Sequence, residues 1–329
     1  MNVRDYPAEW GKRQQATTGV SPDPKKRMST ANIRRISAGQ ARLLALAAAV
    51  LFSTGGAAIK TGAFSVAMVS CVRSGIAAVA LLLWLRGRVS RAPLVLGVGT
   101  AYASTLTLFV AATKLTTAAS AIFLQSTAPL YILLLGPVVL GERIRLRDAA
   151  YIAAAGAGLL LCFAGQSAPT ATAPNPLLGN VLGIVCGAAW AATLMGLRRV
   201  QREARPGAAD PGVSTVVAGN AIACLAALPF AWPLPPAPAG EWLTLGYLGV
   251  IQIGLAYVCL SAAMRHLPAL EIALLLLLEP VLNPLWTWLV RGEEPGGWAL
   301  AGGAVIVAAT AAKSVYESRT SQASRDDVR

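Results

Sequence analysis

The sequence has few charges, a single histidine and no paired cysteines. Of its 329 residues 13% are charged, whereas an average soluble domain carries about 25%. A soluble domain with so few charged side chains would lack the polar surface that covers a core. The cysteines stand singly in apolar runs, so they predict small buried side chains and neither a zinc site nor a disulfide framework. They are Cys71, Cys162, Cys186, Cys224 and Cys259.

Sequence motifs for catalysis are also missing. The only histidine, His266, lies at the edge of an apolar run, and no HExxH, GxSxG or nucleotide-binding glycine loop occurs in a fitting context. The sequence therefore argues against an enzyme and predicts no cofactor and no metal site. A net charge of +13 would suit nucleic acid in a soluble protein. Here the basic residues lie between apolar runs, which indicates membrane-protein loops and not a nucleic-acid partner.

Long apolar segments are abundant. Hydrophobic residues make up 55% of the chain, and its mean hydropathy is +0.58. A helix needs about 20 mainly apolar residues to cross the hydrocarbon core of a bilayer. The sequence therefore predicts an all-α, polytopic membrane protein with ten transmembrane helices in a lipid bilayer. The predicted spans are residues 43–59, 64–85, 93–113, 118–140, 149–164, 178–197, 214–232, 242–263, 269–290 and 297–315.

The basic residues predict the orientation of these spans. With the N-terminus inside, 24 of the 28 Lys and Arg residues fall in inside segments, and Lys60, Lys114 and Arg291 fall outside. Cytoplasmic loops carry such an excess of Lys and Arg. Both termini are therefore expected in the cytoplasm. Residues 1–40 are expected to form a disordered cytoplasmic tail, and residues 316–329 a second cytoplasmic tail.

Two distant segments share one pattern. Each holds a basic residue, a proline fifteen positions later, and a Gly-Glu pair beginning twelve positions after the proline. All markers are displaced by the same 151 residues, without a gap. They are Lys114, Pro129 and Gly141-Glu142 in the first segment, and Arg265, Pro280 and Gly292-Glu293 in the second.

This repeat predicts an inverted topology. Its two copies are the fourth and ninth spans, and these cross in opposite directions because they lie an odd number of spans apart. We therefore expect two inverted five-helix units, over residues 41–165 and 177–315. Many secondary transporters have this architecture, with a substrate site near the midplane and alternating access by rocking of one unit against the other.

The same patterns resemble a known family. The Ala-rich helix with a mid-helix proline and a terminal Gly-Glu occurs twice, and the sixth span ends in Trp190…Arg198-Arg199. Over residues 41–315 the chain resembles the EamA family of the drug/metabolite transporter superfamily. The resemblance implies ten helices, a central cavity and export of amino acids or other metabolites. Smaller multidrug relatives use a first-span glutamate for proton coupling, and the first span here has none.

Two charges within spans are the leading candidates for a central site. Arg73 and Glu279 lie near the middle of the second and ninth spans, where a charge costs at least about 2.5–3.5 kcal/mol. Asn283 and Trp286 share a helix face with Glu279, and this set is suited to the amine and the apolar body of a metabolite. We expect Arg73 and Glu279 to meet directly or through substrate. The alternative is a structural ion pair that joins two helices.

Other polar, amphipathic and proline residues complete the candidate site. Trp190 lies in mid-span, away from the aromatic belts at the interfaces, although such a residue is as often plain packing. A proline inside a helix frees a backbone carbonyl and forms either a cavity wall or a static kink. The predicted binding residues are Arg73, Gln125, Trp190, Gln252, Tyr257, Glu279, Asn283 and Trp286, and the predicted helix breaks are Pro129, Pro280 and Pro284.

The sequence thus predicts a carrier that exports a small-molecule substrate by alternating access, as a multi-pass protein of the inner membrane. Proton coupling through Glu279 and facilitated diffusion both remain open at this stage. A channel and a membrane protein without a transport role are the alternatives. A carrier would saturate and exchange substrate, and a channel would not. The sequence indicates no oligomeric state.

Overall fold

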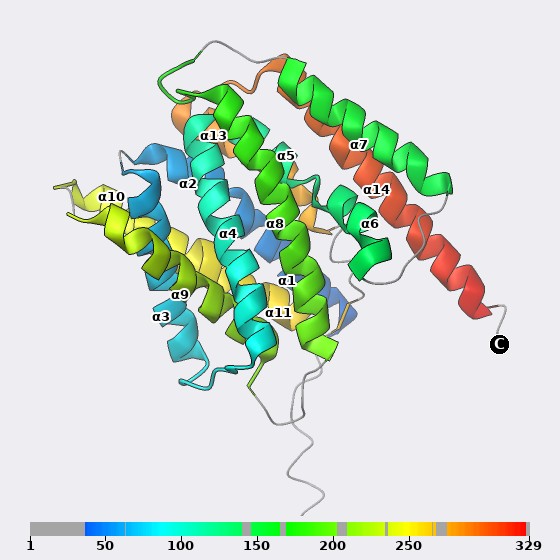
Figure 1. The fold of residues 1–329 in the computed structure, drawn as a ribbon, viewed down its shortest axis with the longest axis horizontal. Helices are drawn as coiled ribbons and strands as arrows, with labels where there is room; N and C mark the ends of the chain where they lie inside the picture. The colour runs from blue at the N-terminus through cyan, green and yellow to red at the C-terminus, as the bar shows by residue number, and fades with distance from the viewer. Residues whose placement is uncertain are drawn as a thin grey trace, which may run out of the picture. The chain divides into compact units, whose positions relative to one another are not determined.

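The computed structural model describes residues 37–62, 64–139, 146–164, 169–202, 209–233, 236–264, 266–267 and 275–326. By contacts the chain divides into residues 1–37 and 38–329, and the helices among the described residues lie in the second unit. Most of the predicted N-terminal tail falls outside the described residues. The helices are α1 (Ala38–Ser53), α2 (Gly55–Thr61), α3 (Val66–Trp84), α4 (Pro93–Leu115), α5 (Ala118–Gln125), α6 (Ala128–Val139), α7 (Leu146–Ala164), α8 (Pro176–Arg202), α9 (Pro211–Ala231), α10 (Ala239–Tyr247), the π-helix η3 (Leu248–Leu255), α11 (Ala256–Met264), α13 (Leu278–Arg291) and α14 (Gly297–Asp326) (Figure 1).

Helix starts follow local sequence signals. Ser65 caps α3 by accepting a hydrogen bond from the backbone N–H of Met68 at 3.2 Å, and Thr117 caps α5 in the same way. Asp210 caps α9, whose first residue is a proline. Such residues satisfy backbone donors that a helix start leaves unpaired, and proline suits the first position because it has no N–H.

The first predicted span is divided in two. α1 ends at Ser53 and α2 begins at Gly55. The hydroxyls of Ser53 and Thr54 donate to the carbonyls of Val50 and Leu51, each at 2.7 Å. These local bonds compete with the helical ladder, so the helix is interrupted at the point where the two glycines follow.

The fourth and ninth predicted spans are interrupted just before their repeated prolines. α5 ends at Gln125, and α6 begins at Ala128 with Pro129 as its second residue. In the ninth span a turn at Leu277 precedes α13, which begins at Leu278 with Pro280 as its third residue. Proline is tolerated in the first turn of a helix, where its missing N–H removes no hydrogen bond.

The eighth predicted span changes its helical type midway. It runs through α10, the π-helix η3 and α11 without a gap. A π-helix has i→i+5 hydrogen bonds and is frequent at functional sites. Gly249 lies within η3 against α3, where a Cβ atom would come 2.7 Å from Ile76. The glycine therefore lets the wider helix pack closely on its neighbour.

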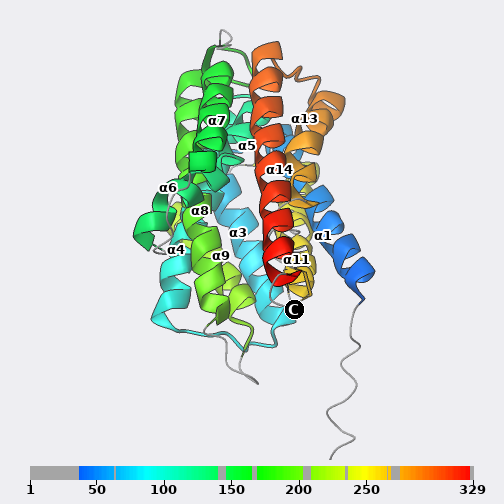
Figure 2. The same cartoon turned by 90° about the vertical axis from the view of Figure 1, so that its right-hand side faces the viewer.

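The helices form a bundle that runs mainly along one direction (Figure 2). α4 packs against α8 and α9, α3 packs against α9, and α1 packs against α11. α14 lies along α7 on one side of the bundle in Figure 1, where Gly158 meets the backbone of Gly302 closely. Small residues at such contacts let membrane helices approach one another.

Six helical segments among the described residues are long and apolar enough to cross a membrane. They are Gly39–Lys60, Val66–Trp84, Pro93–Leu115, Pro176–Leu197, Pro211–Ala231 and Ala239–Ala263. They match six of the ten predicted spans, and the shorter apolar helices Ala150–Leu161 and Gly297–Ala312 lie in two more. The predicted span 118–140 consists of two short helices, α5 and α6, and the predicted span 269–290 contains α13.

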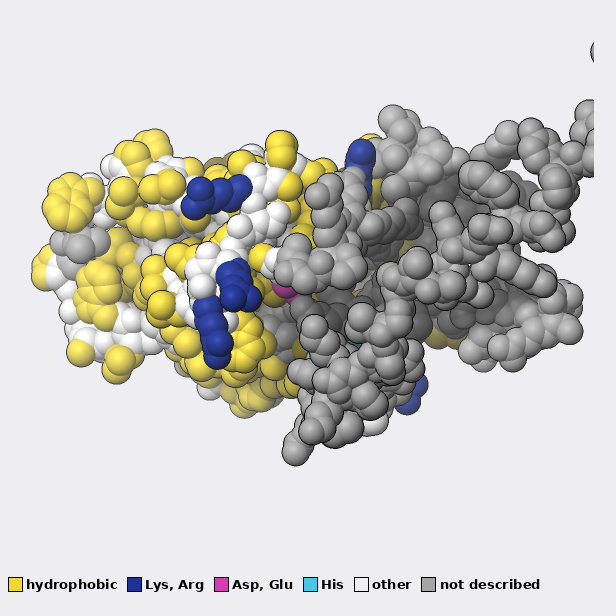
Figure 3. All heavy atoms as spheres, turned by 90° about the horizontal axis from the view of Figure 1, so that it is seen from below, with side chains coloured by type: hydrophobic (Ala, Val, Ile, Leu, Met, Phe, Trp, Pro, Cys, Tyr) yellow, Lys and Arg dark blue, Asp and Glu magenta, His cyan; other side chains and the backbone are white. Residues whose placement is uncertain are grey.

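Large apolar side chains cover much of the outer surface. Leu83, Leu160, Leu243 and Phe230 are each more than two-thirds exposed. Figure 3 shows hydrophobic side chains over much of the described part of one face, with a few Lys and Arg side chains among them. Such a surface suits lipid and not water, so the fold is an all-α, polytopic membrane protein. α14 continues to Asp326, and the predicted C-terminal tail is therefore largely helical.

Candidate functional site

A cavity of about 220 Å³ lies inside the helix bundle. Its walls come from the middle of α3, α4 and η3, from the interrupted ends of α1, α5 and α13, and from α8, α9, α11 and α14. On α8 it extends from Trp190 to Leu197, in the second half of the helix, and on α9 it is lined by Gly212 and Val216 in the first two turns. The cavity therefore extends from the middle of the bundle toward the end where α8 stops and α9 starts.

Arg73 supplies a positive charge to this cavity. Its side chain is 1% exposed, and one guanidinium nitrogen donates to the carbonyl of Leu106 at 3.3 Å. Its Nε has no hydrogen-bond partner in the described part of the chain. A buried polar group without a partner costs about 1–3 kcal/mol, and more when it is charged. This guanidinium thus has unused hydrogen-bonding capacity.

Glu279 supplies a carboxyl group to the same cavity. It stands one residue before Pro280 in the first turn of α13, and both residues line the cavity. A carboxylate in the first turn is favoured by the helix dipole. Among the described residues, no ion pair or hydrogen bond connects Glu279 with Arg73 or with another side chain. The two predicted charges therefore share one cavity without pairing directly.

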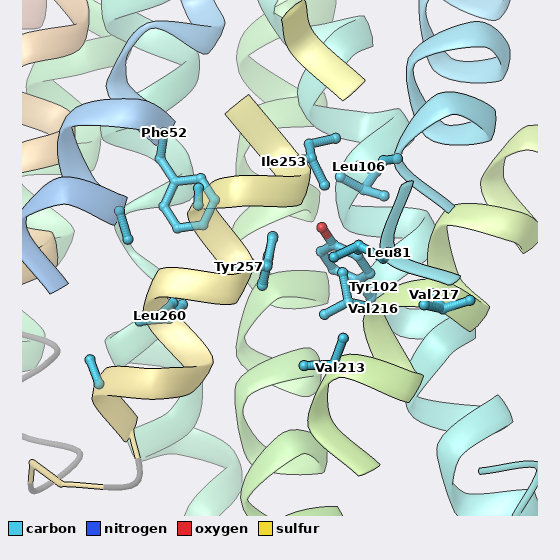
Figure 4. Close-up of a cluster of buried hydrophobic side chains, with 14 of the residues drawn as sticks. Phe52, Leu81, Tyr102, Leu106, Val213, Val216, Val217, Ile253, Tyr257 and Leu260 are labelled. Atoms are coloured by element: carbon cyan, nitrogen blue, oxygen red, sulfur yellow. The ribbon is translucent and has the colours of Figure 1, made fainter. Parts of the chain in front are cut away.

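Aromatic rings form a continuous part of the wall (Figure 4). The rings of Phe52 and Tyr257 meet edge to face with centroids 5.0 Å apart, and those of Tyr102 and Tyr257 with centroids 5.3 Å apart. Trp190 also lines the cavity. Edge-to-face contacts fix ring positions, so this wall is a rigid apolar surface beside the two charges.

Two predicted amide side chains also face the cavity. Gln125 is the last residue of α5 and half-buried, and Gln252 lies in η3 and is buried. Gln252 Nε2 donates to the carbonyl of Phe52 at 3.4 Å, while its Oε1 has no partner in the part of the chain that the structure describes. Arg73, Gln125, Trp190, Gln252, Tyr257 and Glu279 are thus brought together around one space.

Asn283 and Trp286 lie elsewhere, although they share a face of α13 with Glu279. The indole N–H of Trp286 donates to the hydroxyl of Ser53 at 2.9 Å. Asn283 is fully buried against Gly56, whose Cβ atom would overlap the amide oxygen. Both side chains therefore pack against α1 and α2, beyond the cavity.

The three predicted helix-break prolines occupy different surroundings. Pro280 lines the cavity, and Pro284 is buried within α13. Pro129 lies in the first turn of α6, next to the cavity-lining residue Ala128. The backbone interruptions themselves precede Pro129 and Pro280 and lie at the cavity.

Sequence reasoning missed Phe52, Tyr102 and Ser261, which also line the cavity. A signal for Phe52 is present in the sequence. It stands eight residues before Lys60, and Trp190 stands eight residues before Arg198, so both aromatic residues have the same place in their spans. Tyr102 has no comparable signal, because the hydrophobic and polar residues of α4 are not separated onto different faces. Among the described residues, no group of His, Cys, Asp and Glu is arranged to hold a metal ion.

The fold and the cavity define a class: an all-α, multi-pass membrane protein with buried charges around a central space. A family model for the EamA-like transporter family matches residues 40–164 and again residues 177–314. The chain therefore belongs to the EamA-like transporter family.

Two further likenesses agree with this family. The pseudopaline exporter CntI of two Pseudomonas aeruginosa strains is 36% identical over 96 residues, which is 29% of this chain and 34% of the exporter. The match thus spans about a third of that relative. A crystal structure of a protein aligns with a TM-score of 0.58 and 25% identity, covering 86% of this chain and 99% of the other.

Proposed function

We propose that this protein is a secondary transporter of the inner membrane that exports a small metabolite by alternating access. The observation that carries the proposal is the cavity with Arg73 and Glu279 in its wall and no ion pair between them. Charges inside a membrane protein require partners. A substrate with a negative group for Arg73 and a positive group for Glu279 would supply both, while its apolar body would rest on the aromatic wall.

The direction of transport is proposed from two observations. The pseudopaline exporter CntI is an exporter by name, and its similarity supports export here. The cavity extends toward the end of the bundle where α8 stops and α9 starts. Under the orientation proposed from the Lys and Arg distribution, this end faces the cytoplasm. An exporter that accepts substrate from the cytoplasm needs a state in which its cavity opens toward the cytoplasm.

The mechanism rests on the two proposed inverted units, residues 41–165 and 177–315. The cavity takes Arg73 and Gln125 from the first unit and Trp190, Gln252, Tyr257 and Glu279 from the second. A rocking motion of one unit against the other would close the cavity at one end and open it at the other. The helix interruptions at the cavity would act as the hinges of this motion.

The proposal is tested with bacteria that express the protein and are challenged with toxic concentrations or analogues of amino acids and related metabolites. Wild-type protein is expected to confer resistance to one chemical group, and Glu279→Gln is expected to lose it. Glu294→Gln is the matched control, because Glu294 is exposed just beyond α13. Equal resistance from Glu279→Gln, with equal amounts of protein in the membrane, would contradict the proposed site.

Transport in proteoliposomes then separates the remaining alternatives. A carrier is expected to saturate and to show counterflow of labelled substrate, and a channel would show neither. If Glu279 couples transport to protons, an imposed pH gradient will drive uptake in the wild type and not in Glu279→Gln. Facilitated diffusion predicts equal rates with and without the gradient.

A further inference from the structure

A buried ion pair lies at the end of the bundle opposite to the one that the cavity approaches. Lys60 Nζ lies 2.5 Å from Glu293 Oε2, and the two side chains are 3% and 5% exposed. The ammonium group also donates to the backbone carbonyl of Thr116 at 2.9 Å and to that of Thr172. Glu293 Oε1 accepts a hydrogen bond from the backbone N–H of Ala118 at 2.7 Å. We call this group of residues the latch.

The latch lies at the end where α8 begins. Thr116 follows the last residue of α4, and its hydroxyl donates to Asn180 in the second turn of α8 at 2.8 Å. The cavity extends along α8 in the opposite direction, to Leu197. The latch and the approach to the cavity are therefore at opposite ends of the same helices.

The ion pair joins the two halves of the chain. Lys60 belongs to the first segment that matches the family model, and Glu293 to the second. Alternating access requires these halves to separate at each end in turn. In a low-dielectric surrounding, separation leaves two unpaired charges, which is strongly unfavourable unless water enters. The pair therefore favours the closed arrangement of this end.

Two short helices connect the latch with the cavity. α5 begins at Ala118 in the latch and ends at Gln125 in the cavity wall, about 12 Å away. α13 begins next to Glu279 in the cavity wall, and Glu293 follows after Gly292, which has φ 63° in the left-handed region that glycine favours. A substrate that moved the cavity end of either helix would therefore act on a helix whose other end lies at the latch.

The surface between cavity and latch is closed by direct packing. Trp286 donates to Ser53, and Asn283 lies against Gly56. Gln252 lies against Gly55, where a Cβ atom would come 2.8 Å from the amide nitrogen. The second half of the chain thus rests on the glycines at the interruption between α1 and α2. These contacts join the two halves of the chain between the cavity and the latch.

We infer that Lys60 and Glu293 form a gate that holds this end of the transporter closed, and that their ion pair separates each time this end opens. The inference rests on the proposed function, because an opening step exists only in a protein that transports by alternating access. Under the proposed orientation the latch end is the external one. The ion pair then holds the state in which the cavity is accessible from the cytoplasm.

The test measures access to single cysteines in a protein without its native ones. One reporter is Thr113→Cys, since Thr113 is buried on α4 between the cavity residue Phe109 and the latch residue Thr116. The other is Ser261→Cys, since Ser261 lines the cavity on α11. A membrane-impermeant maleimide is added to intact cells and to inverted vesicles. The native cysteines replaced by alanine are Cys71, Cys162, Cys186, Cys224 and Cys259.

Lys60→Met is expected to raise labelling at position 113 from the latch side by at least about tenfold and to lower labelling at position 261 from the other side. Opposite changes in labelling at the two positions indicate a shift between the two access states, because a loosened fold would raise labelling at both positions. Arg291→Met is the control, since Arg291 is an exposed cation at the same end. It is expected to change neither rate.

Unchanged labelling at position 113 in Lys60→Met, or a rise at both reporters, would overturn the inference. If Lys60→Met does not reach the membrane, Glu293→Gln is tested in its place under the same criteria. Lys60→Arg keeps the charge and is expected to retain protection. The labelling needs no substrate, so it tests the gate even if growth and transport assays find none.

Discussion

The cavity and the latch differ in whether their buried polar groups have partners within the protein. In the cavity, Arg73 Nε and Gln252 Oε1 have no hydrogen-bond partner in the described part of the chain. In the latch, Lys60 has a carboxylate and two carbonyls around it, and Glu293 also binds a backbone N–H. The latch therefore pairs its two charges with each other. The cavity leaves Arg73 and Gln252 with unused hydrogen-bonding capacity where we propose that a substrate binds.

This difference has an energetic meaning. An unpartnered buried group costs stability in the resting protein and becomes favourable when a ligand pairs with it. A paired group stabilises the resting protein and opposes any motion that separates it. Substitutions in the two regions should consequently have opposite effects on stability.

The largest effect on stability is expected in the latch. Lys60→Met leaves the Glu293 carboxylate buried without its cation, and loss of one partner of a buried ion pair costs about 3–5 kcal/mol. The thermal unfolding temperature of the purified protein in detergent should fall clearly. Lys114→Met serves as the control, because Lys114 donates to the carbonyl of Gly62 in the same half of the chain. Equal unfolding temperatures of the two variants would contradict the proposed stabilising role of the latch ion pair.

The next largest effect is expected in the cavity. Arg73→Leu removes a buried guanidinium that has spare donors, so transport should fall about 10–100-fold, the worth of hydrogen bonds to a charged group. Stability should stay equal or rise, because an apolar residue of similar size is often neutral or stabilising in place of a buried charge. Transport and melting are measured on the same preparation. A large drop in the unfolding temperature would show that Arg73 is structural.

A smaller effect is expected where the two halves of the chain meet. Gly56→Ala places a Cβ atom on the amide of Asn283, which is fully buried and has little room to move. Overpacking of this kind costs about 1–3 kcal/mol. Asn283→Ala should relieve the overlap, so the double variant should melt closer to the wild type than Gly56→Ala does. Additive losses in the double variant would contradict this contact.

The smallest effect is expected at Trp286. Trp286→Phe keeps an aromatic ring and removes the N–H that donates to Ser53, which should cost about 0.5–1.5 kcal/mol. Transport should change little, since Trp286 does not line the cavity. Trp190→Phe is the comparison on the cavity side and should alter substrate affinity more than stability. If Trp286→Phe altered substrate affinity and Trp190→Phe altered stability, then Trp286 would be the binding residue and Trp190 the structural one.

Hydropathy alone predicted the all-α membrane fold and six membrane-length helical segments close to their observed bounds. Long apolar runs have few alternatives in a bilayer, which explains this success. The interruptions at Thr54 and at residues 126–127 were harder to foresee. They depend on which backbone N–H and C=O groups form hydrogen bonds with side chains or with neighbouring helices. The composition of a 20-residue window does not contain this information.

Six of the eight predicted binding residues line one cavity. Charged residues such as Arg73 and Glu279 are identifiable because a membrane helix excludes charge unless a neighbour requires it. Asn283 and Trp286 share a helix face with Glu279, yet they meet a different helix because α13 extends beyond the cavity. The spacing of residues along a helix predicts the direction in which their side chains point. It does not predict which neighbouring helix lies in that direction. The latch needs four separate chain segments, which hold Lys60, Thr116 with Ala118, Thr172 and Glu293, so no local pattern could indicate it.

The π-helix η3 has a consequence for how this protein can vary. Gln252 and Tyr257 are five residues apart and both line the cavity. In a regular α-helix such residues point about 140° apart, because each residue turns the chain by about 100°. The wider π turn reduces this angle. Loss of a single residue between them would restore the regular α-helical turn and leave them four residues apart, which is about 40° by the same rotation. The residue that the π turn adds can thus be lost while Gln252 and Tyr257 stay on the same side of the helix.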